Sequence, residues 1–126
     1  MNESFAKARS LKLGDRIGAL INGRRQELTI TGQSAHAGTT PMRLRRDPGY
    51  VAAAITTGVR AIATQMAGTQ VATVGRLEFT PNLVNVVPAQ VVMTVDLRNT
   101  DEALLQQAEA VFRALCERLA QEEGVT

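Results

Sequence analysis

The side chains in this sequence that could take part in chemistry are few, and the first is a histidine. His36 is the only histidine among the 126 residues, and its neighbours Ala35, Ala37 and Gly38 are all small. Small neighbours leave room for the imidazole to project toward a bound molecule, with which it could exchange a proton. The spacing alone leaves a second interpretation open, in which His36 is an ordinary surface or capping histidine.

Two further polar side chains stand where they could bind a ligand. Asn85 falls in the apolar stretch LVNVVP, where an amide must find hydrogen-bond partners. Arg98 ends an alternating segment on the face opposite its apolar residues. A guanidinium there could hold a carboxylate through two parallel hydrogen bonds. More commonly, such an arginine pairs at the surface with a residue such as Asp96 or Glu78.

Other kinds of catalytic site are disfavoured by the residues on offer. A zinc site takes three or four ligands from histidine, cysteine and carboxylates, whereas the single histidine and the single cysteine, Cys116, are 80 positions apart. Ser34 lies close to His36, but no carboxylate is evident to complete a nucleophile–base pair. The surrounding segment also lacks the lysine of a phosphate-binding loop. The sequence therefore predicts no metal or other cofactor bound by this chain.

The composition indicates one globular domain with an aliphatic core, because hydrophobic residues make up 44% of the chain and aromatic residues only 3%. The net charge of +2 is small, and the cluster Arg43, Arg45 and Arg46 is interpreted as a solvated turn. Nucleic-acid binding is not expected, since single-strand and RNA readers usually add stacking aromatics. No apolar run approaches the roughly 20 residues of a membrane span. A lone cysteine suits a reducing compartment, so we expect a cytoplasmic location.

Local signals predict the elements of the first half of the chain. Asn22–Gly23 between alternating segments is typical of a hairpin turn. Asp47 followed by Pro48 is typical of a helix start, and Gly68 of a helix end. The predicted segments are a leader or linker over 1–14, strands near 16–21 and 24–31, and a helix between Asp47 and Gly68.

The second half is predicted as two strands and a helix. The segment Val71–Phe79 alternates, with Val71, Thr73, Leu77 and Phe79 assigned to one face. A loop with two prolines follows, and then a strand over 91–98 with one apolar face. Asn99 and Glu102 stand at the spacing of a capping box for a second amphipathic helix, which ends near Gly124.

This order of elements predicts the fold class. It corresponds to an α+β, ferredoxin-like βαββαβ two-layer sandwich, in which two helices cover one face of an antiparallel sheet. An extra hairpin is expected at the N-terminus, and the last strand is expected to be absent or truncated. The strand over 71–79 would lie at a sheet edge, and an unpaired edge invites pairing with a second copy of the chain. We therefore expect a homodimer.

Three stretches in register resemble one family. GQSAHAGTTPM over 32–42 with Arg46–Asp47, then ATVGRL over 72–77, then NVVP over 85–88 with Asp96–Arg98 are similar to the lid, or dimerisation, domain of the hydantoinase/carbamoylase family. That family includes N-carbamoyl-amino-acid amidohydrolases, β-ureidopropionase and allantoate amidohydrolase. It belongs to the aminoacylase and carboxypeptidase superfamily. The resemblance covers about residues 16–126.

The resemblance implies a division of labour. Such enzymes combine a lid of the βαββαβ type with a catalytic domain that holds two zinc or manganese ions. It implies that His36 reaches the partner subunit's active site and polarises the scissile carbonyl, while Asn85 and Arg98 bind the substrate and Arg98 grips its carboxylate. The metal ligands and the catalytic glutamate of the family have no counterpart here, and Ala89 replaces the usual glycine after NVVP.

Two hypotheses follow. In the first, residues 15–126 are the dimerisation and substrate-binding lid of an amidohydrolase that acts on linear amides such as N-carbamoyl amino acids or allantoate. The catalytic metal-binding domain is absent from this chain, so the chain alone has no activity. In the second, the chain is a non-enzymatic ligand-binding or RNA-binding module with a ferredoxin-like fold, because a fold does not fix a function.

Overall fold

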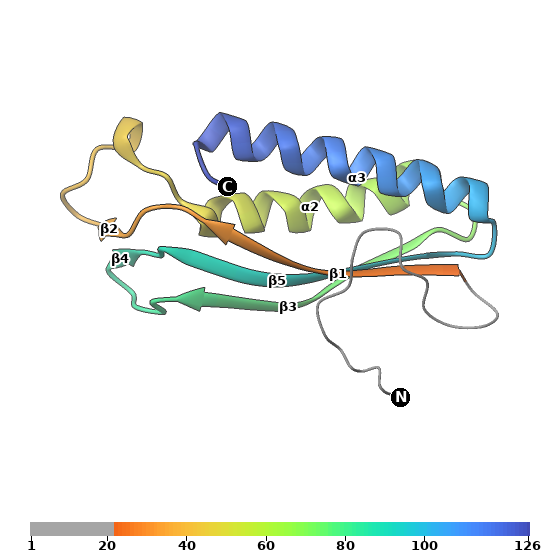
Figure 1. Cartoon of the computed structure of the whole chain (residues 1–126), viewed down its shortest axis with the longest axis horizontal. Coiled ribbons are helices and arrows are strands. Elements are labelled where there is room, and N and C mark those ends of the chain that lie inside the picture. The colour runs from red at the N-terminus through yellow and green to blue at the C-terminus, as the bar shows by residue number, and fades with distance from the viewer. Residues whose placement is uncertain (1–21) are drawn as a thin grey trace.

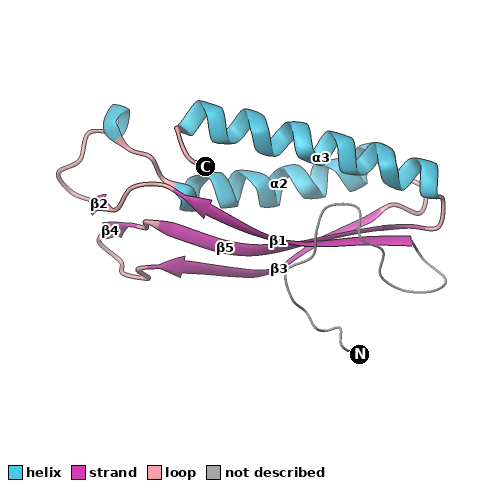
Figure 2. Ribbon diagram, viewed as in Figure 1, coloured by secondary structure: helices cyan, strands magenta, loops and turns pink. Residues whose placement is uncertain are grey.

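A computed structural model of the protein describes residues 22–126, which form an antiparallel sheet covered on one face by two helices (Figure 1, Figure 2). The strands of the sheet lie in the order β1-β5-β3, and two short strands, β2 and β4, form a separate pair beyond one end. This arrangement confirms the predicted α+β two-layer class. The elements are β1 (Asn22–Thr31), β2 (Ala35–His36), η1 (Met42–Leu44), α2 (Pro48–Met66), β3 (Val71–Thr80), β4 (Val86–Val87), β5 (Gln90–Asn99) and α3 (Glu102–Glu123).

The core lies between the central strand β5 and the two helices. Alternate side chains of β5 point toward the helices and are almost fully buried, as the period of two in this segment predicts. Apolar side chains at helical spacing on α2 and α3 cover them. The hydrophobic core residues of these three elements are Val91, Met93, Val95 and Leu97 of β5, Val51, Ala52, Ile55, Val59 and Ile62 of α2, and Leu105, Ala108, Phe112 and Leu119 of α3.

The start of α2 is the one the sequence predicts. The Asp47 carboxylate accepts hydrogen bonds from the backbone N–H groups of Gly49 and Tyr50, and Pro48 occupies the first helical position. The Asp47 N–H donates to Glu123 at the end of α3 (3.1 Å), so the same residue joins the two helices.

The start of α3 differs from the prediction, because Asp101 and not Asn99 is the N-cap. The Asp101 carboxylate accepts from the N–H groups of Ala103 and Leu104. Asn99 is 1% exposed, and its side-chain amide makes other hydrogen bonds. Nδ2 donates to Gln70 Oε1 (2.8 Å), and Oδ1 accepts from the Asp101 N–H (2.9 Å). A buried amide needs such partners, so Asn99 belongs to the strand end and the predicted capping box does not form.

The predicted turn at Asn22–Gly23 is also wrong. Both residues belong to β1, where they pair with Asn99 and Arg98 of β5. Ten consecutive pairs with the central strand β5 hold the chain extended through the Asn-Gly dipeptide, which overrides its local preference. The predicted strand near 16–21 and the leader over 1–14 lie outside the described residues.

The faces of β3 differ from the prediction as well. The pairing with β5 shifts register between Val74 and Arg76, which leaves Gly75 as an extra residue. Leu77 therefore faces the helices together with its partner Met93, whereas Val71 and Thr73 face away with Arg98 and Asp96. One inserted residue thus moves half of the strand to the other face.

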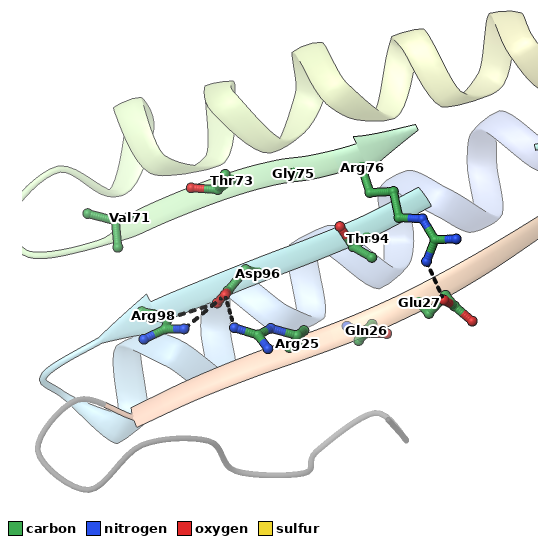
Figure 3. A pocket seen from close by; sticks show the side chains of 10 residues that line it. All are labelled: Arg25, Gln26, Glu27, Val71, Thr73, Gly75, Arg76, Thr94, Asp96 and Arg98. Carbon is green, nitrogen blue, oxygen red and sulfur yellow. Dashed lines mark hydrogen bonds and ion pairs between the residues drawn. The ribbon is translucent and has the colours of Figure 1, made fainter. Parts of the chain in front are cut away.

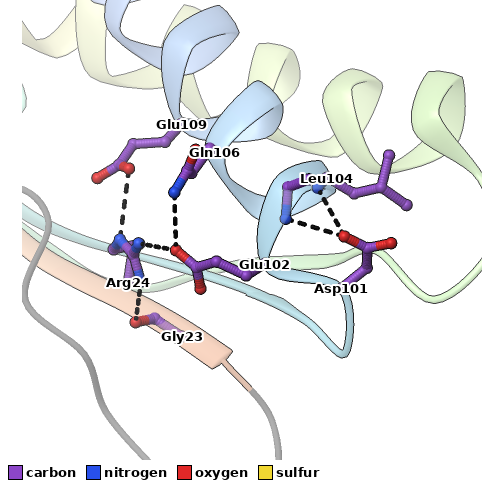
Figure 4. Close-up of polar contacts among 8 residues, drawn as sticks. Gly23, Arg24, Asp101, Glu102, Leu104, Gln106 and Glu109 are labelled. Carbon is purple, nitrogen blue, oxygen red and sulfur yellow. Dashed lines mark hydrogen bonds and ion pairs between the residues drawn. The ribbon is translucent and has the colours of Figure 1, made fainter.

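An ionic cluster ties the start of β1 to α3 (Figure 4). The Arg24 side chain is 6% exposed and binds Glu102 (2.7 Å) and Glu109 (3.3 Å) while also donating to the Gly23 carbonyl. The cluster lies where β1 has no further strand beside it among residues 22–126. No strand follows α3 in this part of the chain; instead, the Thr126 N–H donates to the Thr31 carbonyl (3.0 Å) at the end of β1.

Candidate functional site

His36 lies on an exposed tip formed by β2 and β4, beyond the end of the main sheet (Figure 1). Ala35 pairs with Val87 and His36 with Val86. The Gly38 N–H donates to Nδ1 of the imidazole (3.0 Å). Because Nδ1 accepts a hydrogen bond, the proton of the neutral ring resides on Nε2. The tip therefore presents an N–H donor to its surroundings.

Asn85 lies next to His36, since its carbonyl accepts a hydrogen bond from the Ala37 N–H (2.9 Å). Its side chain is exposed, whereas the apolar stretch around it predicts a buried amide. The difference arises because Leu83 and Val84 are themselves exposed, at 59% and 105%. An exposed amide needs no partner within the protein and is free to meet a ligand.

The basic turn is only partly solvated. Arg43 and Arg46 are exposed, as predicted, but Arg45 is half-buried. Its guanidinium donates to the carbonyls of Ala37 (2.6 Å) and Thr40 (3.1 Å). Arg45 is therefore part of the structure that carries His36.

Arg98 lies near the other end of β5, on the face of the sheet that the helices do not cover (Figure 3). Asp96 holds its guanidinium through two hydrogen bonds of 3.0 Å, to Nε and Nη2. These bonds raise the pKa of Arg98 above its ordinary value. Arg25 of β1 reaches the same carboxylate from the neighbouring strand (3.4 Å). The surface pairing with Asp96 that the sequence left open is thus present.

An open hollow of about 540 Å³ surrounds Arg98 on this face. Its walls carry three guanidinium groups and two carboxylates (Figure 3). At one side Arg76 binds both Glu78 and Glu27, and the hydrogen bond with Glu78 raises the pKa of Arg76 and lowers that of Glu78. The lining residues are Arg25, Gln26, Glu27, Val71, Thr73, Gly75, Arg76, Thr94, Asp96 and Arg98.

The sequence does not single out Arg25, Thr73 or Arg76 as candidates, although they line the hollow. Thr73 was assigned to the same face as Leu77 and Phe79, and only the bulge at Gly75 separates them. Arg25 reaches the site through its pairing with Asp96, 71 residues away in the chain. No pattern of neighbouring residues in the sequence predicts that Arg25 and Asp96 lie side by side.

The structure brings His36 and Asn85 together but keeps Arg98 apart from them. Arg98 is eight residues along β5 from Gln90, which follows β4 closely in the chain. At about 3.3 Å per residue, the strand separates Arg98 from the tip by roughly 26 Å. A molecule of amino-acid size therefore cannot contact both the tip and Arg98 of the same chain.

Metal ligands do not gather in the part of the chain that the structure describes. No group of three or more histidine, cysteine, aspartate or glutamate side chains within residues 22–126 could hold a metal ion. Burial raises the pKa of the Cys116 thiol to about 11, with the charge of Glu117 as a smaller cause. A thiol with this pKa is a poor metal ligand and nucleophile at neutral pH.

Within residues 22–126, neither α2 nor α3 combines the length and apolar character needed to cross a membrane.

The chain is thus an α+β sandwich that presents an imidazole at its tip and an arginine hollow on its open face. It is 41% identical to allantoate amidohydrolase of Escherichia coli over 107 residues, which is 82% of this chain and 26% of that protein. It is also 41% identical to N-carbamoyl-L-amino-acid amidohydrolase of Rhizobium meliloti over 97 residues, 74% of this chain and 23% of that protein. No family model matches the chain.

The fold agrees with these sequence matches. The crystal structure of a hydantoinase/carbamoylase-family amidase from Burkholderia multivorans superimposes with a TM-score of 0.82 and 40% identity, covering 84% of this chain and 26% of that one. By sequence and by fold, the chain is homologous to one segment of the amidohydrolases of the hydantoinase/carbamoylase family. It spans about a quarter of the length of the relatives it matches.

Proposed function

We propose that this chain, over residues 15–126, is the dimerisation and substrate-binding lid of a metal-dependent amidohydrolase. The reaction is hydrolysis of a C–N bond in a linear amide, such as allantoate or an N-carbamoyl amino acid. The names of the relatives support this substrate class. The observation that carries the proposal is the exposed Nε2–H of His36 beside Asn85, because hydrolysis of an amide needs a hydrogen-bond donor for the oxygen that gains negative charge.

Each candidate residue has a role that its chemistry suits. His36 donates from Nε2 to the scissile carbonyl as it becomes an oxyanion. The side-chain amide of Asn85 binds the substrate next to it. Arg98 holds the substrate carboxylate with its planar guanidinium. Either the substrate carboxylate displaces Asp96 from the guanidinium, or it binds the N–H donors that Asp96 does not use.

The separation of these residues supports action in trans. Because roughly 26 Å of strand divides Arg98 from the tip, a single lid cannot place His36 and Arg98 on one substrate. We propose that each active site combines Arg98 of one chain with His36 and Asn85 of the partner. The site is then complete only in the dimer.

The exposed edge of β3 is the surface we assign to that dimer. β3 is an edge strand of the described sheet, and its Val71 is 54% exposed. An edge with unpaired backbone groups can add the same strand of a second copy. The Arg76–Glu78 ion pair on this strand could instead protect the edge. Sedimentation that finds only monomers at high micromolar concentration would rule the dimer out.

The metal ions of the proposed enzyme do not fit the described residues. Two zinc or manganese ions would need several carboxylate and imidazole ligands, and residues 22–126 bring no such group together. We therefore assign the ions to the three-quarters of the family length that this chain does not span. We also place the protein in the cytoplasm, since its single cysteine forms no disulfide within the chain.

An RNA-binding module is the weaker alternative. Its support was the basic turn, of which only Arg43 and Arg46 are exposed. These two arginines line a second hollow, separate from the one around Arg98, together with Glu122 and Glu123. The two carboxylates would repel a phosphate backbone.

A chimaeric enzyme tests the proposal. Residues of this chain would replace the matching 107-residue segment of the Escherichia coli allantoate amidohydrolase. We expect the chimaera to hydrolyse allantoate, the His36→Ala version to lose about 100-fold or more in kcat, and Arg98→Met to raise KM. Arg118→Lys, at a 60% exposed side chain, is the matched control. Hydrolysis by the 126-residue chain alone with added zinc or manganese would contradict the division of labour, as would full activity without His36.

A further inference from the structure

Arg45 is a half-buried arginine whose guanidinium joins two backbone carbonyls of one turn. Nη2 donates to the Ala37 carbonyl (2.6 Å) and Nε to the Thr40 carbonyl (3.1 Å). The Arg45 backbone N–H is itself fixed by the Met42 carbonyl (3.1 Å), at the end of η1. Its two neighbours in the basic cluster, Arg43 and Arg46, are exposed. Of these three arginines, Arg45 is therefore the one whose side chain braces the segment that follows His36.

The braced turn carries the donor that fixes the imidazole. Residues 37–40 leave β2, and the Thr40 N–H closes the turn on the His36 carbonyl (3.2 Å). Within the turn, the Gly38 N–H donates to Nδ1 of His36 (3.0 Å). On the other side, the Ala37 N–H is bound to the Asn85 carbonyl (2.9 Å). The orientation of the Gly38 N–H thus depends on contacts that Arg45 holds in place.

The imidazole also rests against Gly38 itself. A Cβ at this position would lie 3.2 Å from Cε1 and 3.5 Å from Nδ1 of His36. The first distance is tighter than ordinary van der Waals contact, so a side chain there would push the ring away. The ring and the turn are therefore matched to each other.

We propose that Arg45 is a positioning residue that locks His36 in the neutral Nε2–H tautomer. By holding the carbonyls of Ala37 and Thr40, Arg45 keeps the Gly38 N–H on Nδ1, so that Nε2 carries the proton and points away from the turn. Hydrogen bonds from a charged donor are stronger than neutral ones, and two from one planar group also fix direction. Lysine could not replace it, because a single ammonium does not bridge two carbonyls in the same fixed geometry. The catalytic use of this tautomer rests on the proposed function. The control of the His36 tautomer by Arg45, which we call the lock, does not.

The single histidine makes the lock directly measurable. Long-range proton–nitrogen correlation spectra of the imidazole report which ring nitrogen carries the proton, and with one histidine in the chain the signals need no assignment. The spectra would be recorded on the 126-residue protein near pH 8, where an ordinary imidazole is neutral. We expect the unmodified protein to show protonated Nε2 and unprotonated Nδ1 as one sharp set of signals.

Two Arg45 variants test the dependence. We expect Arg45→Met to give a mixture of tautomers, with an increase of at least about tenfold in the ratio of the Nδ1–H form to the Nε2–H form, since one charge-assisted hydrogen bond is worth about that factor. Arg45→Lys should give a similar but smaller change. Arg43→Lys is the matched control and should leave the spectrum unchanged. Backbone amide spectra of each variant establish that the sandwich is folded.

A second variant, Gly38→Ala, tests the contact between the turn and the imidazole directly. Gly38→Ala should displace the ring and shift both ring-nitrogen signals while leaving Arg45 in place. A folded Arg45→Met variant with the tautomer of the unmodified protein would overturn the proposal, as would a Gly38→Ala variant with unchanged ring signals. In the chimaeric enzyme, Arg45→Met should lower kcat about tenfold with little change in KM. If the chimaera worked without His36 but the spectra behaved as expected, the proposed function would fail and the lock would stand.

Discussion

Asp96 grips Arg98 through two hydrogen bonds of 3.0 Å, which is the same bidentate geometry that a substrate carboxylate would use. The two residues lie on one face of β5, two positions apart. Asp96 therefore competes with any anionic ligand for the guanidinium. At the same time it holds the side chain over the hollow, together with Arg25.

The first prediction concerns this competition. Asp96→Asn should strengthen the binding of a small carboxylate such as N-carbamoylglycine to the isolated chain by about fivefold to tenfold. The variant removes the internal acceptor and leaves Arg98 and Arg25 without their shared counter-charge, and a charge-assisted hydrogen bond is worth about 1 kcal/mol or more. Shift changes of amide signals during a titration would give the affinity. Arg98→Met should abolish binding, and weaker binding by Asp96→Asn would contradict the idea.

The second prediction concerns the ionic cluster between β1 and α3. Arg24→Met should lower the free energy of unfolding by about 3–5 kcal/mol, because it leaves the Glu109 carboxylate buried without its cation. The side chains of Arg24 and Glu109 are 6% and 11% exposed, so water screens them little. Urea unfolding measures the effect. The double variant Arg24→Met with Glu109→Leu should recover most of the loss, and a loss that persists in the double variant would point to packing instead.

The third prediction concerns a close backbone approach. A Cβ at Gly32 would overlap the Arg46 carbonyl oxygen and lie 2.6 Å from Pro48 Cδ. Gly32→Ala should therefore displace the loop or the start of α2 and cost about 1–3 kcal/mol. Gly75→Ala is the control, since its Cβ would meet only Thr94 Oγ1, at 3.7 Å. Equal melting temperatures for the two variants would show that the contact at Gly32 relaxes freely.

The fourth prediction concerns Cys116. Burial raises the pKa of its thiol to about 11 from the usual 9.0, so near pH 8 the folded protein holds about 100-fold less thiolate than a free cysteine. Reaction with a disulfide reagent should be slower by a similar factor and should reach the ordinary rate in denaturant. Since the unfolded chain releases this proton at lower pH than the folded one, stability should fall as the pH rises from about 9 through 11. Fast labelling of the native protein near pH 8 would contradict the assignment.

The sequence predicted those parts of the fold that depend on neighbouring residues. The cap of α2 at Asp47 and Pro48 forms as expected, because the groups that it satisfies are two and three residues away. The buried face of β5 follows from strict alternation. Gly124 ends α3 in the left-handed conformation, at φ 75°. The resemblance to the amidohydrolase family was also evident from three short motifs that follow one another in the same order along the chain.

The tertiary structure alone decided the rest. The extended path through Asn22–Gly23 and the register shift at Gly75 depend on pairing with β5, which lies far away in the chain. The partners of Arg98, the donor to His36 Nδ1 and the distance between these two candidates likewise follow from how the strands align. Local patterns encode which face a residue prefers, but the partner that it meets is set by contacts between distant segments. These contacts form only when the sheet and its two helices bury their common core.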